Sequence, residues 1–434
     1  MKKIVKLLSL LLAMLMIVGC FTACGPSETP DGTDASENVG GNTETGEFMV
    51  AWWGEDTRHN KTIEVLKEFD KLSPSTETKV KYCGSAEFWT MLDIDIAGNT
   101  MPDVFQMTYK MIDVYAESGN LLDLTPYYES GALDLSGVDE KYMEMCYYQG
   151  GMYAVPTGVN VPVYLYNPAD VQAAGCTLSR NPTLDELIEV AKKVYDTTGK
   201  KMYMEFEEYV RMYGETYYTD DGMQVGFSPE LLADFWKFER AGMDYGYFAK
   251  PEEGIEGGTQ GIIDGTMWLF TTYSNQIQWA EDTTGVDLEW MAIPCTEEVP
   301  NTTFIQPNTL WCVGATTDNP ERAIELLNFF TNNEIFYNSL GYDRGMAISA
   351  TIREYLEPNA TEDMKLQAQI LEELDSLGAL CDRPTASVYD GQAKGALTDY
   401  MQMNKYGMFG EDEMLEMAQE AIATMNEDMA KAAG

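Results

Sequence analysis

The sequence predicts an α/β protein, in which parallel strands alternate with helices behind an N-terminal targeting segment and a polar linker. Three observations lead to this prediction. Apolar residues make up 45% of the 434 residues, which is enough material for a packed core. Strand-like and helix-like segments alternate along residues 48–106. The length corresponds to about two to three domains, or to one large two-lobed body.

The first residues form a secretory signal. Three lysines precede an apolar run over residues 7–18, and small residues with cysteines follow at once. The run is short for a membrane-spanning helix. The order apolar, small, small, Cys looks like a bacterial lipoprotein signal, in which the cysteine is acylated after cleavage. Cys20 and Cys24 both fit. We favour Cys24, with residues 1–23 as the signal peptide, because Gly25 and the linker follow it; Cys20 is the alternative.

A polar segment follows the cysteines. Residues 26–47 contain no large apolar side chain, so they cannot bury enough surface to offset the entropy of an ordered chain. Residues 24–47 are therefore expected to be a lipidated cysteine and a flexible tether. An anchor followed by a tether implies a body held at the extracellular face of the cell membrane, or on the periplasmic side if the source has an outer membrane.

The body is expected to open with alternating strands and helices. Phe48–Trp53 is an apolar, β-rich run. Apolar residues then recur every three positions over residues 63–72, which predicts an amphipathic helix. Residues 78–82 predict a second strand, 88–97 a helix and 102–106 a short buried strand. This order is typical of an α/β layer with parallel strand pairing.

Helix and strand signals continue along the chain. Residues 161–166 predict a strand that ends at Asn167-Pro168. Thr183 and Glu186 form a capping box for the next helix. Ser228-Pro229 and Asn319-Pro320 each supply a cap and a first helical position. The Met-rich segment from Glu411 onward predicts a final amphipathic helix.

Composition excludes several function classes. The 71 acidic and 28 basic residues give a net charge of −43, which repels nucleic acids. The chain has one His and no Cys-x-x-Cys, so no metal site is expected. The six cysteines beyond the signal are scattered, and apolar neighbours such as those of Cys312 favour free thiols. The sequence has no nucleophile elbow, phosphate loop or H-E-x-x-H motif, so no catalytic residues and no cofactor are expected.

Six segments of the body form an ordered set of short motifs: 51–54 with 58–59, 97–104, 153–156 with 166–168, 261–268, 319–323 and 344–346. Together, and behind a lipoprotein signal, they resemble the extracellular sugar-binding lipoproteins of bacterial ABC importers, which are similar to maltose-binding protein. The likeness extends over roughly residues 48–430. Pro168 replaces the family's usual Lys, and Arg344-Gly345-Met346 lacks its usual Pro.

The resemblance implies a two-lobed periplasmic-binding-protein-like fold of type II, whose lobes are joined by a multi-strand hinge and hold the ligand in the cleft between them. By analogy the chain crosses between the lobes near residues 156–161, 294–306 and 341–348. The implied division is an N-terminal lobe of residues 48–156 plus about 306–345, and a C-terminal lobe of residues 157–305 plus about 346–434.

Candidate ligand-binding residues follow from the chemistry of sugars. Aromatic rings cover the C–H faces of a sugar, whereas amides, carboxylates and arginine bond its hydroxyl groups. Adjacent strand residues face opposite ways, so at most one tryptophan of the pair that ends the first strand is expected to pack in the core. Core packing is the alternative for the tryptophans, and an ion pair with Asp343 is the alternative for Arg344. The candidates are Trp52, Trp53, Glu55, Arg58, Trp268, Ser274, Asn275, Trp311 and Arg344.

The resemblance implies the substrate-binding component of an ABC sugar importer. Such a protein is a monomer and not an enzyme; it captures a carbohydrate outside the cell and delivers it to the permease. The 26 Tyr and 8 Trp favour an oligosaccharide. The alternatives are a receptor for another polar solute, an adhesive lipoprotein, and a surface-anchored glycoside hydrolase. The hydrolase would need two carboxylates about 5–10 Å apart.

Overall fold

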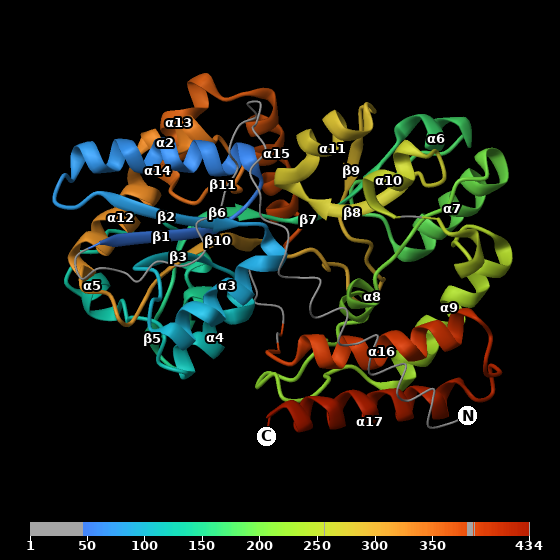
Figure 1. Cartoon of the computed structure of the whole chain (residues 1–434). Helices are drawn as coiled ribbons and strands as arrows, with labels where there is room; N and C mark the ends of the chain where they lie inside the picture. The colour runs from blue at the N-terminus through green and yellow to red at the C-terminus, as the bar shows by residue number, and fades with distance from the viewer. Residues whose placement is uncertain (1–46, 256, 380–384, 386, 434) are drawn as a thin grey trace, which may run out of the picture. The chain divides into compact units, whose positions relative to one another are not determined.

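The computed structural model describes residues 47–433 except 256, 380–384 and 386 (Figure 1). The predicted signal peptide, both candidate acylation sites and almost all of the tether lie outside the described residues. Cys381 lies outside them as well. Within the described part, no helix combines the length and the apolar character that crossing a membrane requires. Cys83, Cys176, Cys295 and Cys312 carry free thiols, as the sequence predicts.

A six-stranded mixed sheet forms the first half of the fold, with strand order β11-β6-β10-β3-β1-β2. β1 pairs in parallel with β2 and β3, as the alternating pattern predicts. β10 runs antiparallel between β3 and β6, and β11 adds to the outer edge of β6. The strands are β1 Phe48–Trp53, β2 Thr78–Cys83, β3 Val104–Met107, β6 Val155–Asn160, β10 Gln306–Val313 and β11 Met346–Ala347.

Helices cover both faces of this sheet (Figure 1). The crossovers β1-α2-β2 and β2-α3-β3 lead in opposite directions across the sheet. Right-handed crossovers therefore place α2 and α3 on opposite faces. α13 packs against α2, and α12 packs against β6 and β10. The helices are α2 Asp56–Leu72, α3 Ser85–Gly98, α4 Tyr109–Glu117, α5 Thr125–Glu129, α12 Pro320–Asn332, α13 Glu334–Leu340 and α14 Ala350–Leu356.

A three-stranded antiparallel sheet, in the order β8-β7-β9, carries the second half of the fold. β7 (Pro162–Tyr166) begins two residues after β6 ends, so the chain passes directly from the first sheet to the second. β8 (Leu269–Tyr273) and β9 (Glu289–Met291) flank β7. The remaining hairpin consists of β4 Tyr147–Tyr148 and β5 Gly151–Met152.

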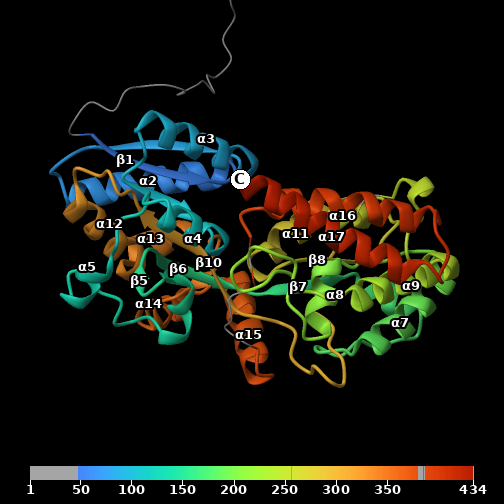
Figure 2. The same ribbon diagram turned by 90° about the horizontal axis from the view of Figure 1, so that it is seen from below.

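Helices of the second half build a second apolar core on one face of β7, which contributes Tyr164 and Tyr166 to it, whereas Val163 and Leu165 belong to the first core. α9, α16 and α17 pack against one another, and Figure 2 shows α16 and α17 side by side. α15 (Glu362–Ser376) contacts both β11 and the short turn that follows β8. The division into lobes near residues 156, 305 and 345 therefore stays a prediction. The helices are α6 Pro168–Ala173, α7 Leu184–Thr198, α8 Phe206–Met212, α9 Pro229–Tyr245, α10 Gly258–Ile263, α11 Ile277–Thr284, α16 Asp390–Lys405 and α17 Met414–Ala433.

Two of the three predicted helix caps form in the structure. The capping box at α7 is complete, since Thr183 Oγ1 accepts from the Glu186 amide at 3.2 Å and the Glu186 carboxylate accepts from the Thr183 amide at 2.9 Å. Ser228 caps α9 through the amide of Leu231. Asn319 precedes α12 as predicted, but its side chain makes no capping bond.

Two tight backbone contacts fix β11 against β6. A Cβ at Gly158 would lie 2.1 Å from the carbonyl oxygen of Arg344, so only glycine fits there. Gly345 has φ +90°, and a Cβ on it would lie 2.7 Å from the carbonyl oxygen of Val159. The backbone geometry therefore requires glycine at position 345, beside Arg344. It lets residues 344–347 approach the sheet closely.

Candidate functional site

A cavity of about 360 Å³ lies where the second sheet faces α4. β8 contributes Tyr273, α4 contributes Tyr109 and Lys110, and the segment 205–217 forms most of the wall. Phe304, in the segment that leads into β10, closes another side. The cavity thus draws its lining from separate chain segments between Tyr109 and Thr385, and it is within the size range of small-molecule sites.

Acidic side chains dominate this cavity. Glu205, Glu207, Glu208 and Glu215 all line it. Burial raises the pKa of Glu208 to about 7, although its carboxylate accepts a hydrogen bond from the Tyr164 hydroxyl. Desolvation also raises the pKa of Glu205, which is partly exposed. The two glutamates cap α8 reciprocally, which holds both carboxylates at the cavity wall.

A second, larger cavity of about 800 Å³ adjoins the first, and the two share Lys110 and Thr385 in their linings. Asp113 and Glu117 on α4 face the turn at Asp220 and Asp221 across it. We call the two cavities together the groove. Its combined size exceeds that of a single-sugar pocket and suits an extended ligand.

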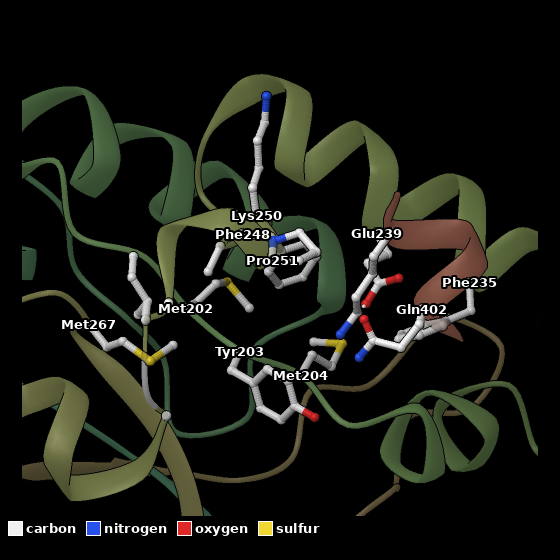
Figure 3. A pocket seen from close by; sticks show the side chains of 15 residues that line it. Met202, Tyr203, Met204, Phe235, Glu239, Phe248, Lys250, Pro251, Met267 and Gln402 are labelled. Carbon is white, nitrogen blue, oxygen red and sulfur yellow. Dashed lines mark ion pairs between the residues drawn. The ribbon is translucent and has the colours of Figure 1, made fainter. Parts of the chain in front are cut away.

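A third cavity, of about 260 Å³, lies entirely within the second half of the fold (Figure 3). Methionine and aromatic side chains such as Met202, Met267 and Phe248 surround it. Its acidic residue, Glu239, is already paired with Lys405 at 3.3 Å. Its lining residues all lie between Met202 and Lys405, and none belongs to the first sheet or to the helices that cover it, so a ligand in this cavity would contact the second half alone.

The predicted residues of the first strand and its loop lie near one another but outside the cavity lining. Trp52 is fully buried; its ring stacks on Tyr82 at 5.4 Å and its indole N–H donates to His59. Trp53 is half-buried, with its ring centroid 5.0 Å from that of Phe88. This is the opposite-facing arrangement that strand alternation predicts. Glu55 is exposed at the start of α2.

Arg58, Asn275 and Arg344 converge on the segment at Asp343. Arg58 Nε donates to the Asp343 carboxylate at 2.7 Å, and Asn275 Nδ2 donates to the Asp343 carbonyl at 3.0 Å. Burial alone would raise the pKa of Asp343, but the Arg58 guanidinium holds that pKa below its ordinary value. Asp343, which was the expected alternative partner of Arg344, therefore pairs with Arg58 instead.

Arg344 is buried and points into the first half of the fold. Its guanidinium donates to Gln106 Oε1 at 2.8 Å and to Thr62 Oγ1 at 3.0 Å, and lies over the ring of Trp311 at 5.3 Å. Burial lowers the pKa of Arg344, yet a guanidinium stays protonated at neutral pH. Trp311 is fully buried and packs on Phe330 at 4.6 Å.

A chain of amides continues from Asn275 across the strand ends. Asn160 Nδ2 donates to Asn275 Oδ1 at 3.0 Å, and Gln306 Nε2 donates to Asn160 Oδ1 at 3.2 Å. Ser274 Oγ accepts from the amide of Val161 at 3.3 Å. We call Arg58, Asn160, Asn275, Gln306 and Asp343 the crossing network, because it joins all three segments where the resemblance places lobe crossings.

The structure therefore brings together Arg58, Asn275 and Arg344, with Ser274 beside them, whereas Trp268 lies in the core of the second half. None of the nine predicted residues lines the 360 Å³ cavity, and their role in binding remains a prediction. The four glutamates of the cavity could not be selected from the sequence, because nothing in it separates them from the other acidic residues, 71 in all. Among the described residues, no group of His, Cys, Asp and Glu is arranged to hold a metal ion.

The shifted pKa of Glu208 predicts a pH-dependent stability. A carboxyl group whose folded pKa is about 7 stabilises the fold fully below its ordinary pKa of about 4.3, and this stabilisation is lost as the pH rises through about 7. Glu208→Gln should therefore raise the free energy of unfolding relative to the parent by about 1–2 kcal/mol more at pH 8 than at pH 5, after allowance for partial exposure. Chemical denaturation at both pH values measures this difference.

Glu230→Gln is the matched control, because Glu230 is an exposed glutamate on α9. It should show the same difference from the parent protein at both pH values. A Glu208→Gln profile parallel to that of the control would contradict a raised pKa at Glu208.

Comparison with known proteins assigns this fold. The family described as bacterial extracellular solute-binding protein matches residues 64–368. An extracellular solute-binding protein of family 1 from Alicyclobacillus acidocaldarius has a TM-score of 0.70 and 22% identity, and the alignment covers 88% of this chain and 98% of that one.

Two further solved structures are similar. A periplasmic oligogalacturonide binding protein from Yersinia enterocolitica, in complex with saturated digalacturonic acid, has a TM-score of 0.72 and 22% identity over 88% of this chain and 99% of that one. An ABC substrate-binding protein from Listeria monocytogenes, in complex with cycloalternan, has a TM-score of 0.72 and 19% identity over 88% and 99%. The α/β architecture is thus that of type II periplasmic solute-binding proteins, as the resemblance implied. The chain belongs to the bacterial extracellular solute-binding protein family, whose members bind solutes.

Proposed function

We propose that this chain is the substrate-binding component of an ABC sugar importer, which captures an oligosaccharide outside the cell and delivers it to the transmembrane subunits of the permease. The observation that carries this proposal is the groove. It lies where the second sheet faces α4, and it combines aromatic rings with clustered hydrogen-bond acceptors. In this proposal the protein acts as a monomer and is not an enzyme.

The lining of the groove suits carbohydrate. Tyr273 is 40% exposed, so its ring can cover the C–H face of a sugar. Ionised carboxylates such as Glu205 only accept hydrogen bonds, and sugar hydroxyls donate them. The adjoining 800 Å³ cavity gives room for further sugar units, which favours an oligosaccharide over a monosaccharide.

The nine residues predicted from the sequence keep a place in this proposal. Trp53 and Glu55 retain accessible surface and can contact ligand from the first half of the fold. Arg58, Ser274, Asn275 and Arg344 would act where the proposed lobes meet. The buried rings of Trp52, Trp268 and Trp311 would support the site from the core.

A glycoside hydrolase is the second candidate function, because one observation favours it. Glu205 and Glu208 are neighbouring carboxyl groups with raised pKa values at a cavity wall, a pattern found in acid–base sites. The family's solute-binding character supports the receptor instead. Incubation with oligosaccharides separates the two functions, since a hydrolase releases reducing ends and a receptor does not.

A sugar panel tests the receptor function. We expect at least one oligosaccharide to raise the melting temperature without turnover. Tyr273→Ala should weaken the affinity for that sugar by about 0.5–1.5 kcal/mol beyond the effect of lost area, because it removes an aromatic platform. Isothermal titration calorimetry measures the loss. Tyr355→Ala is the control, because Tyr355 is 51% exposed on α14 and outside the groove.

Two results would count against this function. If the Tyr273 and Tyr355 variants bind the sugar with equal affinity, the groove is not the binding site. If a polar solute that is not a sugar raises the melting temperature and no sugar does, the substrate is that solute class and not a carbohydrate.

The proposed anchor is testable in cells. We propose that Cys24 is acylated, with Cys20 as the alternative, and that residues 24–47 tether the body at the membrane surface. Cys24→Ala should reduce labelling by a palmitate analogue and release protein into the medium; the double Cys20/Cys24 variant should abolish both labelling and membrane association. Cys312→Ala, a free thiol of the body, serves as control. Continued acylation of the double variant would contradict the anchor.

A further inference from the structure

The charge of the groove is strongly unbalanced. Its lining contains eight acidic side chains, four in each cavity, whereas its only basic side chains among the described lining residues are Lys110 and Arg211. The acidic residues are Glu205, Glu207, Glu208 and Glu215 in the smaller cavity and Asp113, Glu117, Asp220 and Asp221 in the larger one.

Both basic side chains are already engaged by the protein. Lys110 Nζ lies 3.9 Å from Glu207 Oε1. Arg211 donates through Nε to the carbonyl of Thr302, and its guanidinium lies over the ring of Phe304 at 4.5 Å. Lys394, beside the cavity, pairs with Glu207 at 3.1 Å. An acidic ligand would therefore have to displace the Glu207 carboxylate to reach Lys110 or Lys394, and at Arg211 it would compete with the backbone carbonyl of Thr302.

The carboxylates that face the groove favour a ligand rich in uncharged donors. Hydroxyl groups donate to ionised carboxylates, and such charge-assisted bonds are stronger than neutral ones. A carboxylate on the ligand would instead lie among like charges, with no donor of its own to offer. Repulsion of this kind lowers affinity and discriminates between ligands that have the same shape.

We propose that the acidic lining of the groove selects uncharged oligosaccharides and excludes their acidic counterparts, such as uronides. This inference rests on the proposed function, in which the groove binds carbohydrate. It assigns the segment 205–208 and the facing edge of α4 a role in specificity. Glu207 is the centre of this role, because it neutralises both Lys110 and Lys394.

Matched trisaccharide pairs test this inference. Galactotriose with trigalacturonic acid, and maltotriose and cellotriose each with its C6-oxidised form, differ only in carboxylates. By calorimetry, the neutral member of any pair that binds should bind about tenfold or more tightly than the acidic member at low salt. Raising the salt concentration from about 0.01 M to about 1 M should reduce this difference in affinity, because salt screens the repulsion.

Glu207→Gln should also reduce the difference in affinity within a pair, because it removes one carboxylate, releases Lys110 and leaves Lys394 paired with Asp390 alone. Glu416→Gln removes the same charge from an exposed position on α17 and should leave the difference in affinity within a pair unchanged. The inference would be overturned if an acidic trisaccharide binds as tightly as its neutral partner. It would also be overturned if the difference in affinity within a pair is the same in the Glu207 and Glu416 variants. If no member of any pair binds, the proposed carbohydrate function fails first, and this inference fails with it.

Discussion

The ion pair between Arg58 and Asp343 anchors the crossing network on which the arrangement of the sheets depends. It holds the first turn of α2, where the sequence predicted a loop, against a segment 285 residues later. From Asp343 the network continues through Asn275 and Asn160 to Gln306, so one set of hydrogen bonds ties four distant segments together. These hydrogen bonds form only when the strand ends are aligned in this way, although the buried Oε1 of Gln306 has no hydrogen-bond partner among the described residues.

The groove is a consequence of that alignment. β6 and β7 are separated by only one residue, so the position of the second sheet follows from where the first sheet ends. Tyr273 closes β8 directly before Ser274, which bonds to the backbone of Val161. The aromatic side of the groove is thus attached to the crossing network, and Glu208 of α8 is held against the same sheet by the hydroxyl group of Tyr164.

The sequence predicts much of the fold because its local signals agree. The apolar periods of α2 and β1, the capping box at Thr183 and the proline after Ser228 each specify an element that the structure contains. The candidate site was less predictable. Trp268 is buried in the core of the second half, and Trp311 in the core of the first half. The sequence does not show which side chains each core will cover. Glu207 of α8 meets Lys110 only through folding, and no spacing in the sequence marks that contact.

The central claim is that a carbohydrate is held between the two halves of the fold and stabilises their closed arrangement. Small-angle X-ray scattering, with and without the sugar that gives the largest thermal shift, tests this claim most directly. We predict a smaller radius of gyration in the presence of the sugar, with an unchanged circular dichroism spectrum. A sugar that binds tightly and leaves the scattering curve unchanged would contradict closure around the ligand.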